Sequence, residues 1–253
     1  MSDHTKHGAP EAAPIDISER GAPKDGVPQV SERRLFMQLL VFEHPSNYDA
    51  AVHFLQARLT QGGISAVLYA DVNHPQGLGL LTFSEDPTHF VSRVHDAVRE
   101  CNRVTDIAPW RVRPEFSMLG RTYSTGFESD LGHWLLDRPR DTVMHEGWDW
   151  AVWYPLKRIG AFNRLDPKEQ GAILREHGTI GRQYGAQDLA HDIRLACHGL
   201  DGNDNDFIIG LIGPTLYPLS HVVQTMRKTR QTGEFMEHMG PFFVGRVIAR
   251  VRA

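Results

Sequence analysis

The chain has 253 residues, a formal net charge of -4 and a sequence pI near 6.4. Its 41% apolar and 9% aromatic content supports a substantial core in one large or two small domains. The mild negative charge argues against a general affinity for nucleic acid or anionic membranes, so we expect neither as a partner. Cys101 and Cys197 are too few for a disulfide framework and form no CxxC pattern, which favours a reducing cytoplasm.

The first 33 residues are rich in Pro, Gly, Ala and charged side chains. They contain no apolar run long enough for a signal peptide or a membrane span. We therefore predict a disordered N-terminal extension over residues 1–33. His4 and His7 within it are interpreted as solvated side chains rather than metal ligands.

Two similar series of elements follow the extension. In the first half, residues 34–117, the pattern predicts strand 35–42, helix 46–61, strand 64–71, strand 77–83, helix 87–101 and a strand near 110–117. In the second half, residues 148–253, it predicts strand 148–156, helix 166–184, strands 190–197 and 206–212, helix 218–231 and strand 241–249.

The two series suggest a duplication. Residues 79–87 and 210–218 each contain a short apolar strand, a loop of equal length and a proline that can open a helix. Each half then forms a βαββαβ unit whose helices cover one face of an antiparallel sheet. Two such sheets packed face to face would make a barrel-like α+β domain. Chance similarity between two ordinary strand-loop-helix units is the alternative.

Residues 118–147 have few periodic apolar positions and are predicted to be a long linker. Linkers of that length in a compact protein are usually functional or mobile. Arg138 and Arg140 in this segment can either clamp carboxylates or lie unpaired on the surface.

The helix predicted over 166–184 carries the most informative stretch of the chain. Asp166 can cap it, Pro167 suits its first position, and Glu169 completes a capping box. Apolar or aromatic positions recur at helical spacing on a single stripe, which is formed by Ile173, His177, Ile180 and Tyr184. His177 is therefore expected to face the interior.

Two glycines, Gly178 and Gly181, follow this histidine. Each costs roughly 1 kcal/mol relative to alanine inside a helix, which is unexpected if the helix only has to pack. A neutral imidazole beside missing side chains can present an axial ligand to a haem iron. The other interpretation is a core histidine hydrogen-bonded to the backbone, with the glycines ending the helix.

Four motifs in the second half resemble the chlorite dismutase family, which includes coproheme decarboxylases. They are Trp153-Tyr154-Pro155-Leu156-Lys157-Arg158, the stretch from Glu176 to Tyr184, Gly199-Leu200-Asp201 with Asp206-Phe207, and Gly240-Pro241-Phe242-Phe243-Val244-Gly245. The resemblance covers roughly residues 148–249 and extends to the first half only in architecture. It implies a duplicated ferredoxin-like α+β barrel that binds haem b or coproheme in its second half. It also implies a cytoplasmic homo-oligomer, either a ring of five subunits or a dimer.

The resemblance also assigns roles to single residues. His177 matches the proximal histidine that binds iron, and Tyr154 matches the tyrosine that forms a radical in decarboxylases. A phenol near a propionate and an oxidised haem can relay a hydrogen atom, whereas a phenylalanine cannot. The cofactor's propionates would be held by cationic or hydroxyl groups, for which the candidates are Lys157, Arg158, Arg138, Arg140 and Thr232.

The distal residue is ambiguous because the spacing differs from the family pattern. Counting back from Asp206-Phe207 reaches Arg194, whereas counting forward from His177 reaches Ala190, next to His191. On a strand Arg194 and His191 lie on opposite faces, so only one of them can face the porphyrin. We favour Arg194, which would stabilise a bound oxyanion by a charge-assisted hydrogen bond.

Three functions follow from the resemblance. Peroxide-dependent decarboxylation of coproheme to haem b is ranked first because of Tyr154 in its YPL setting, and Arg194 favours the second, degradation of chlorite to chloride and oxygen. Weak peroxidase activity would accompany either enzyme, since a five-coordinate haem with a proximal histidine reacts with peroxide. The third is haem binding or sensing without efficient turnover.

Overall fold

The computed structural model of the protein describes residues 14–43, 47–104 and 109–253. The N-terminal half contains β3 (Phe36–Glu43), α1 (Tyr48–Gln61), β4 (Ala66–Asp71), β5 (Gly77–Ser84), η1 (Phe90–Val94), α2 (His95–Cys101), β6 (Arg111–Val112), η2 (Pro114–Phe116) and β7 (Met118–Arg121). After η3 (His133–Asp137) and α3 (Arg138–Met144), the C-terminal half contains β8 (Trp150–Arg158), η4 (Phe162–Arg164), α4 (Pro167–Ala186), β9 (His191–Ala196), β10 (Phe207–Gly213), α5 (Leu216–Met226), α6 (Arg230–Phe235), β11 (Met236–Met239) and β12 (Phe243–Val251).

The two halves share one strand order. In the first half it is β7-β3-β5-β4, and in the second it is β12-β8-β10-β9. In both, the fourth strand of a βαββαβ unit lies beside the first, and the third separates the first from the second. All of these pairings are antiparallel, so the predicted α+β fold of two ferredoxin-like units is confirmed.

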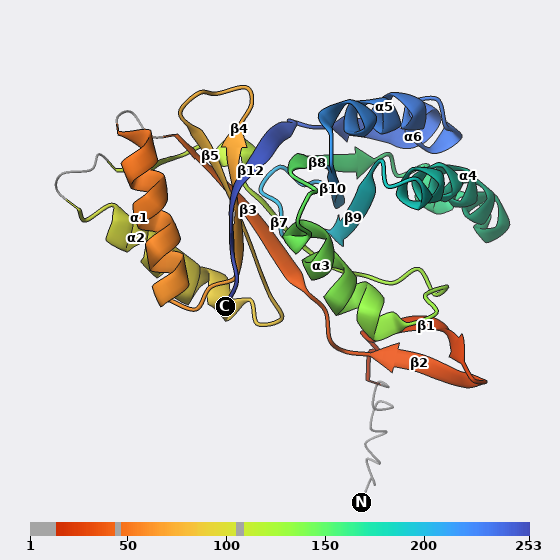
Figure 1. Ribbon diagram of the computed structural model, residues 1–253. Coiled ribbons are helices and arrows are strands. Elements are labelled where there is room, and N and C mark those ends of the chain that lie inside the picture. The colour runs from red at the N-terminus through yellow and green to blue at the C-terminus, as the bar shows by residue number, and fades with distance from the viewer. Residues whose placement is uncertain (1–13, 44–46, 105–108) are drawn as a thin grey trace, which may run out of the picture.

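The two units close into one barrel through two seams. At one seam β12 pairs with β4 from Val251↔Ala66 to Gly245↔Asp71. At the other, β7 pairs with β9 at Arg121↔Ala196. In Figure 1, α1 and α2 lie on one side of this barrel, while α4, α5 and α6 lie on the other.

Large apolar side chains from both halves fill the barrel. Trp153, Tyr69 and Phe243 are almost fully buried there. Two strand glycines make room for the rings: a Cβ atom on Gly210 would lie 2.5 Å from the Trp153 ring, and one on Gly79 would lie 2.5 Å from the Phe243 ring. The interior is therefore a packed core and not a channel.

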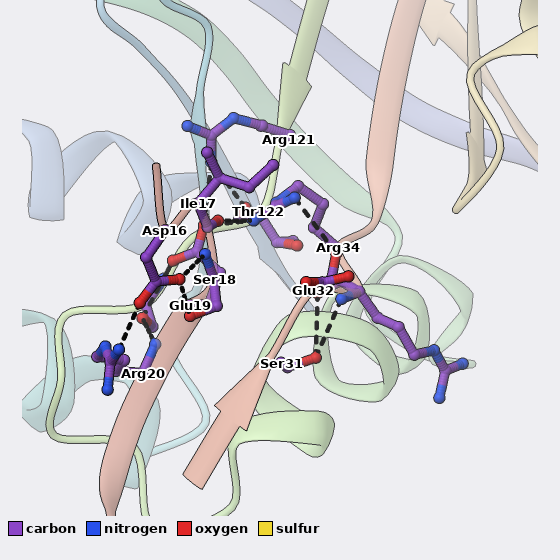
Figure 2. Close-up of polar contacts among 12 residues, drawn as sticks. Asp16, Ile17, Ser18, Glu19, Arg20, Ser31, Glu32, Arg34, Arg121 and Thr122 are labelled. Carbon is purple, nitrogen blue, oxygen red and sulfur yellow. Dashed lines mark hydrogen bonds and ion pairs between the residues drawn. The ribbon is translucent and has the colours of Figure 1, made fainter. Parts of the chain in front are cut away.

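Residues 14–33 do not form the disordered extension that the composition predicts. β1 (Glu19–Lys24) and β2 (Val27–Ser31) make an antiparallel hairpin, so the prediction is wrong for residues 19–31, while His4 and His7 lie outside the described residues. The Glu19 carboxylate is largely buried and pairs with Arg34 at 3.4 Å and with Arg121 at 3.2 Å (Figure 2). These long-range ion pairs hold the segment in place, and composition gives no sign of them.

The segment 118–147, predicted to be a linker, contains one strand and two helical elements, with a loop between β7 and η3. β7 completes the first sheet, and α3 packs Val143 into the barrel core. The strand expected near 110–117 is correspondingly divided between β6 and β7, with η2 between them. The helix expected over 218–231 is also divided, because α5 ends at Met226 and Thr229 caps α6. In the described part of the chain, no helix is both long and apolar enough to cross a membrane.

Candidate functional site

The site lies on the outer face of the second sheet, beneath α4. Strand alternation directs Tyr154 of β8 and Arg194 of β9 to this face, since their neighbours Trp153, Ile193 and Leu195 point into the barrel. Ile209 of β10 pairs with both residues, so the three form one row across the sheet. With neighbouring strands about 4.8 Å apart, Tyr154 and Arg194 are separated by about 10 Å. This face is broad enough for a flat ligand.

Helix α4 begins as its sequence predicts. The Asp166 side chain accepts a hydrogen bond from the Lys168 backbone N–H at 2.8 Å, and Pro167 occupies the first turn. The stripe that includes His177 faces the sheet, but Ile173 is the one fully buried residue of this helix. His177 itself is half-buried. The helix therefore covers the site without being tightly packed against it.

The His177 imidazole is held in its neutral form. Burial lowers its pKa to about 4, and the nearby Arg158 and Arg194 guanidinium groups act in the same direction. Asp192 opposes this shift to a smaller degree. A neutral imidazole is the form that binds a metal, so the ring is ready for ligation at physiological pH.

Thr229, which the sequence analysis did not single out, fixes one ring nitrogen. Its Oγ1 donates to the Met226 carbonyl at 2.8 Å and therefore acts as an acceptor toward His177 Nδ1, 3.5 Å away. In the tautomer in which Nδ1 donates to Thr229 Oγ1, the Nε2 lone pair is available to a metal. Contacts of this kind set the orientation and tautomer of metal-binding histidines.

Arg194 is tied to the structure through Asp192. Its Nε lies 3.1 Å from Asp192 Oδ2. The other carboxylate oxygen accepts from Arg138 Nη2 at 2.9 Å, and Arg138 Nη1 donates to the Asp192 carbonyl at 2.8 Å. Of the predicted distal candidates, Arg194 thus lies on the face beneath α4. His191 instead stacks on Trp148 with ring centroids 3.6 Å apart.

Arg158 is the second cation at the site. Its guanidinium carbon lies 4.6 Å from the ring centroids of both Phe162 and Phe207. Burial lowers its pKa, and its Nε is buried and has no hydrogen-bond partner among the residues that the structure describes. A buried donor of this kind is costly, and an anionic ligand would satisfy it.

Tyr123, in the loop after β7, is a further residue of the site that the sequence analysis missed. Its ring lies 5.6 Å from Phe207, and burial raises its pKa despite the opposing charges of Arg194 and Arg158. A small pocket beside it is lined by Thr122, Tyr123, Glu128, Trp134, Arg138, Pro139, Ile193 and Arg194. Burial alternates along β7, but the residue types Met118-Leu119-Gly120-Arg121 do not, so the sequence gives no clear signal of a strand leading to this tyrosine.

Tyr154 is 5% exposed and lies against Phe242 with ring centroids 4.5 Å apart. Burial raises its pKa, so the phenol keeps its proton at neutral pH. It belongs to the apolar cluster between the sheet and α5. Tyr154 therefore lies on the same face as Arg194, in the part that α5 covers.

The remaining candidates lie away from this cluster or at its edge. Lys157 points to the opposite face of β8 and pairs with Asp204 at 2.7 Å. Arg140 pairs with Glu85 at 3.3 Å. Thr232 lies in the first turn of α6, where its backbone N–H donates to Thr229 Oγ1 at 3.4 Å. Ala190, the residue before β9, is buried in the apolar cluster that also contains Tyr154. Lys157 and Arg140 are thus outside the cluster, whereas Thr232 borders it.

The glycines of α4 do not end the helix, which continues to Ala186. A Cβ atom on Gly181 would find its nearest neighbour, Met226 Cε, at 3.8 Å, and one on Gly178 would lie 3.6 Å from Arg182 Nη1. Both are ordinary contact distances. Packing within the chain therefore does not require either glycine.

Comparisons with known proteins show what the sequence and the fold are similar to. Residues 137–248 match the family model described as chlorite dismutase. No curated protein matched the sequence.

Solved structures share the fold over most of the chain. A haem-binding protein from Thermus thermophilus has 18% identity and a TM-score of 0.63, with 87% of this chain and 92% of that chain covered. A mutant chlorite dismutase from Candidatus Nitrospira defluvii in complex with cyanide has 14% identity and a TM-score of 0.62, with 87% of this chain and 92% of that chain covered. The chlorite dismutase of Candidatus Nitrospira defluvii in complex with imidazole has 13% identity and a TM-score of 0.61, with 87% of this chain and 93% of that chain covered.

The resemblance to the chlorite dismutase family is thus confirmed, by the family model over residues 137–248 and by the shared fold over most of the chain.

Proposed function

We propose that the protein is a haem-dependent oxidoreductase that decarboxylates coproheme with peroxide. The observation that carries this proposal is the half-buried imidazole of His177, which burial keeps neutral and which lies over the sheet face that carries Tyr154 and Arg194. The haem-binding protein and the chlorite dismutases with the same fold support an iron porphyrin as the ligand.

The residues around the face fit an iron porphyrin. His177 would bind the iron, and the open sides of Gly178 and Gly181 would admit the edge of a flat ring. Arg158, with its buried and unpartnered Nε, would pair with a propionate. Phe207 and Ile209 offer an apolar surface to the macrocycle. An iron porphyrin bound here would supply redox chemistry toward peroxide or an oxyanion.

Tyr154 would carry the oxidation to the substrate's propionate. One propionate, one proton and one hydrogen peroxide are converted into one vinyl group, one carbon dioxide and two waters, so peroxide is the oxidant. The phenol holds its proton at neutral pH and can give up a hydrogen atom and regain one from the propionate. Its burial against Phe242 keeps water from the phenol during this exchange.

The test is to add peroxide to the coproheme complex and to follow the mass of the product. We expect successive losses of two carboxyl groups. Tyr154→Phe should abolish both losses while porphyrin binding stays intact. Tyr217→Phe is the matched control, since Tyr217 is 76% exposed on α5. A porphyrin of unchanged mass, or one that is only bleached, would contradict the proposal.

Chlorite degradation is the second candidate, and the state of Arg194 favours it. Its side chain is 40% exposed, and its ion pair with Asp192 uses Nε, so both terminal nitrogens can meet a bound oxyanion. Oxygen release from chlorite by the haem b complex, lost in Arg194→Gln and kept in Tyr154→Phe, would identify this activity. Porphyrin binding without either turnover would leave the third interpretation, a haem-binding or haem-sensing protein.

A further inference from the structure

We propose that Asp192 is a positioning residue that orients the guanidinium of Arg194 toward a bound anion. The proposal follows from a chain of charged groups, Arg138–Asp192–Arg194, in which one carboxylate contacts two arginines through different oxygens. The identity of the anion rests on the proposed function. The contact between Asp192 and Arg194, called the tether below, does not.

Asp192 is itself firmly held. Arg138 donates hydrogen bonds to its backbone carbonyl at 2.8 Å and to its carboxylate at 2.9 Å. The guanidinium of Arg138 is in turn stacked 4.5 Å from the Trp134 ring. Because Asp192 is on β9 and Arg138 is on α3, the carboxylate is fixed by two separate elements. It is therefore a rigid support for a neighbouring side chain.

Arg194 contacts Asp192 through an ion pair in which Nε lies 3.1 Å from Asp192 Oδ2. This ion pair restrains the guanidinium beside the carboxylate, and we infer that the terminal nitrogens Nη1 and Nη2 meet the anion. Arg194 is 40% exposed, so packing alone does not fix a side chain that has several rotatable bonds. The contact with Asp192 holds the guanidinium in one orientation before an anion binds, which lowers the conformational entropy lost on binding.

The tether can be tested in the protein without porphyrin. In protein labelled with ¹⁵N-arginine, the Nε–H of Arg194, assigned with Arg194→Lys, should exchange slowly with solvent. Asp192→Asn should speed that exchange by about fivefold, because a partly exposed ion pair contributes up to about 1 kcal/mol, which corresponds to a factor of about five. The Arg250 Nε–H, which donates to the Val143 carbonyl, serves as the internal reference. Equal exchange of Arg194 in both proteins overturns the proposal.

The consequence for anions is tested with fluoride bound to the ferric haem complex and followed by absorption. Positioning predicts weaker binding in Asp192→Asn, by roughly 2- to 12-fold, the range expected when a mobile side chain must be ordered. A pure charge effect predicts the opposite, since removal of a carboxylate favours an anion. Tighter fluoride binding in Asp192→Asn therefore overturns the proposal.

Two variants of α3 complete the design. Arg138→Gln frees Asp192 and should also speed exchange at Arg194, which keeps the proposal testable if Asp192→Asn does not fold. Arg140→Gln is the matched control, because Arg140 pairs with Glu85 and not with Asp192. It should change neither exchange nor fluoride affinity. If the protein takes up no haem, the proposed function fails, while the exchange measurement still decides the tether.

Discussion

The two halves of the barrel share a strand order but differ in how their outer faces are covered. In the first half, α1 buries Ala51, Val52, Leu55 and Leu59 against its sheet. In the second half, α4 is longer and yet buries only Ile173. The face beneath α1 is apolar, whereas the face beneath α4 carries Arg158, Asp192 and Arg194.

The same βαββαβ unit therefore has two uses: the first copy stabilises the fold, and the second copy carries the residues that can bind a ligand. The first half gains free energy from a closed apolar layer between its helices and its sheet. The second half keeps charged groups and a neutral imidazole where the first half has leucines. A face that can bind a ligand therefore leaves α4 less closely packed and contributes less to stability.

The largest expected effect tests whether only the second half holds the iron. His177→Ala removes the axial ligand and should weaken ferric porphyrin binding by roughly 100-fold or more, with a changed Soret band. His53→Ala, on the corresponding helix α1, should leave both unchanged, since His53 is exposed there and contacts its own helix backbone. An unaltered spectrum in His177→Ala would contradict the assignment of the ligand.

The packing difference can be measured by truncation of one helix residue in each half. Leu55→Ala should lower the free energy of unfolding by roughly 2–5 kcal/mol, because Leu55 is fully buried. Ile180→Ala in α4 should cost about 1 kcal/mol, since Ile180 is only half-buried. Denaturant unfolding without porphyrin measures both values. Equal losses would show that α4 is as closely packed as α1.

Acid should affect the second half through His177. Its folded pKa, about 4, lies below the ordinary value of 6.5, so the unfolded chain binds the proton more tightly between these values. Stability from this residue is present above pH 6.5 and is lost as the pH falls toward 4, by up to about 3 kcal/mol. The unfolding free energy of His177→Gln should lack this part of the pH dependence. Identical pH profiles for the two proteins would be inconsistent with a buried neutral imidazole.

The smallest effect concerns Gly181. Gly181→Ala should stabilise the protein without porphyrin by up to about 1 kcal/mol through helix propensity, because its Cβ meets only ordinary contacts. The same methyl group should weaken porphyrin binding several-fold. Gly171→Ala, on the same helix but off the His177 stripe, should stabilise α4 without altering binding. Unfolding and spectral titrations measure the two effects, and unchanged binding in Gly181→Ala would argue against a ligand beside this residue.

The sequence by itself predicts the repeated unit and the start of α4. Apolar periodicity and the Asp166-Pro167 cap are local signals, and local signals are readable without knowledge of distant contacts. The alternation along β9 likewise separates Arg194 from His191. The motifs of the second half were sufficient to identify the family resemblance.

Only the tertiary structure determines which charged groups meet. Arg138 and Arg140 are equivalent in sequence, yet one contacts Asp192 and the other Glu85, because they point to different sides of α3. The docking of β1 and β2 depends on Glu19 meeting Arg121, a partner about a hundred residues away in the chain. Tyr123 joins the site for the same reason. Such contacts depend on which segments the barrel brings together, and no local pattern of residues encodes them.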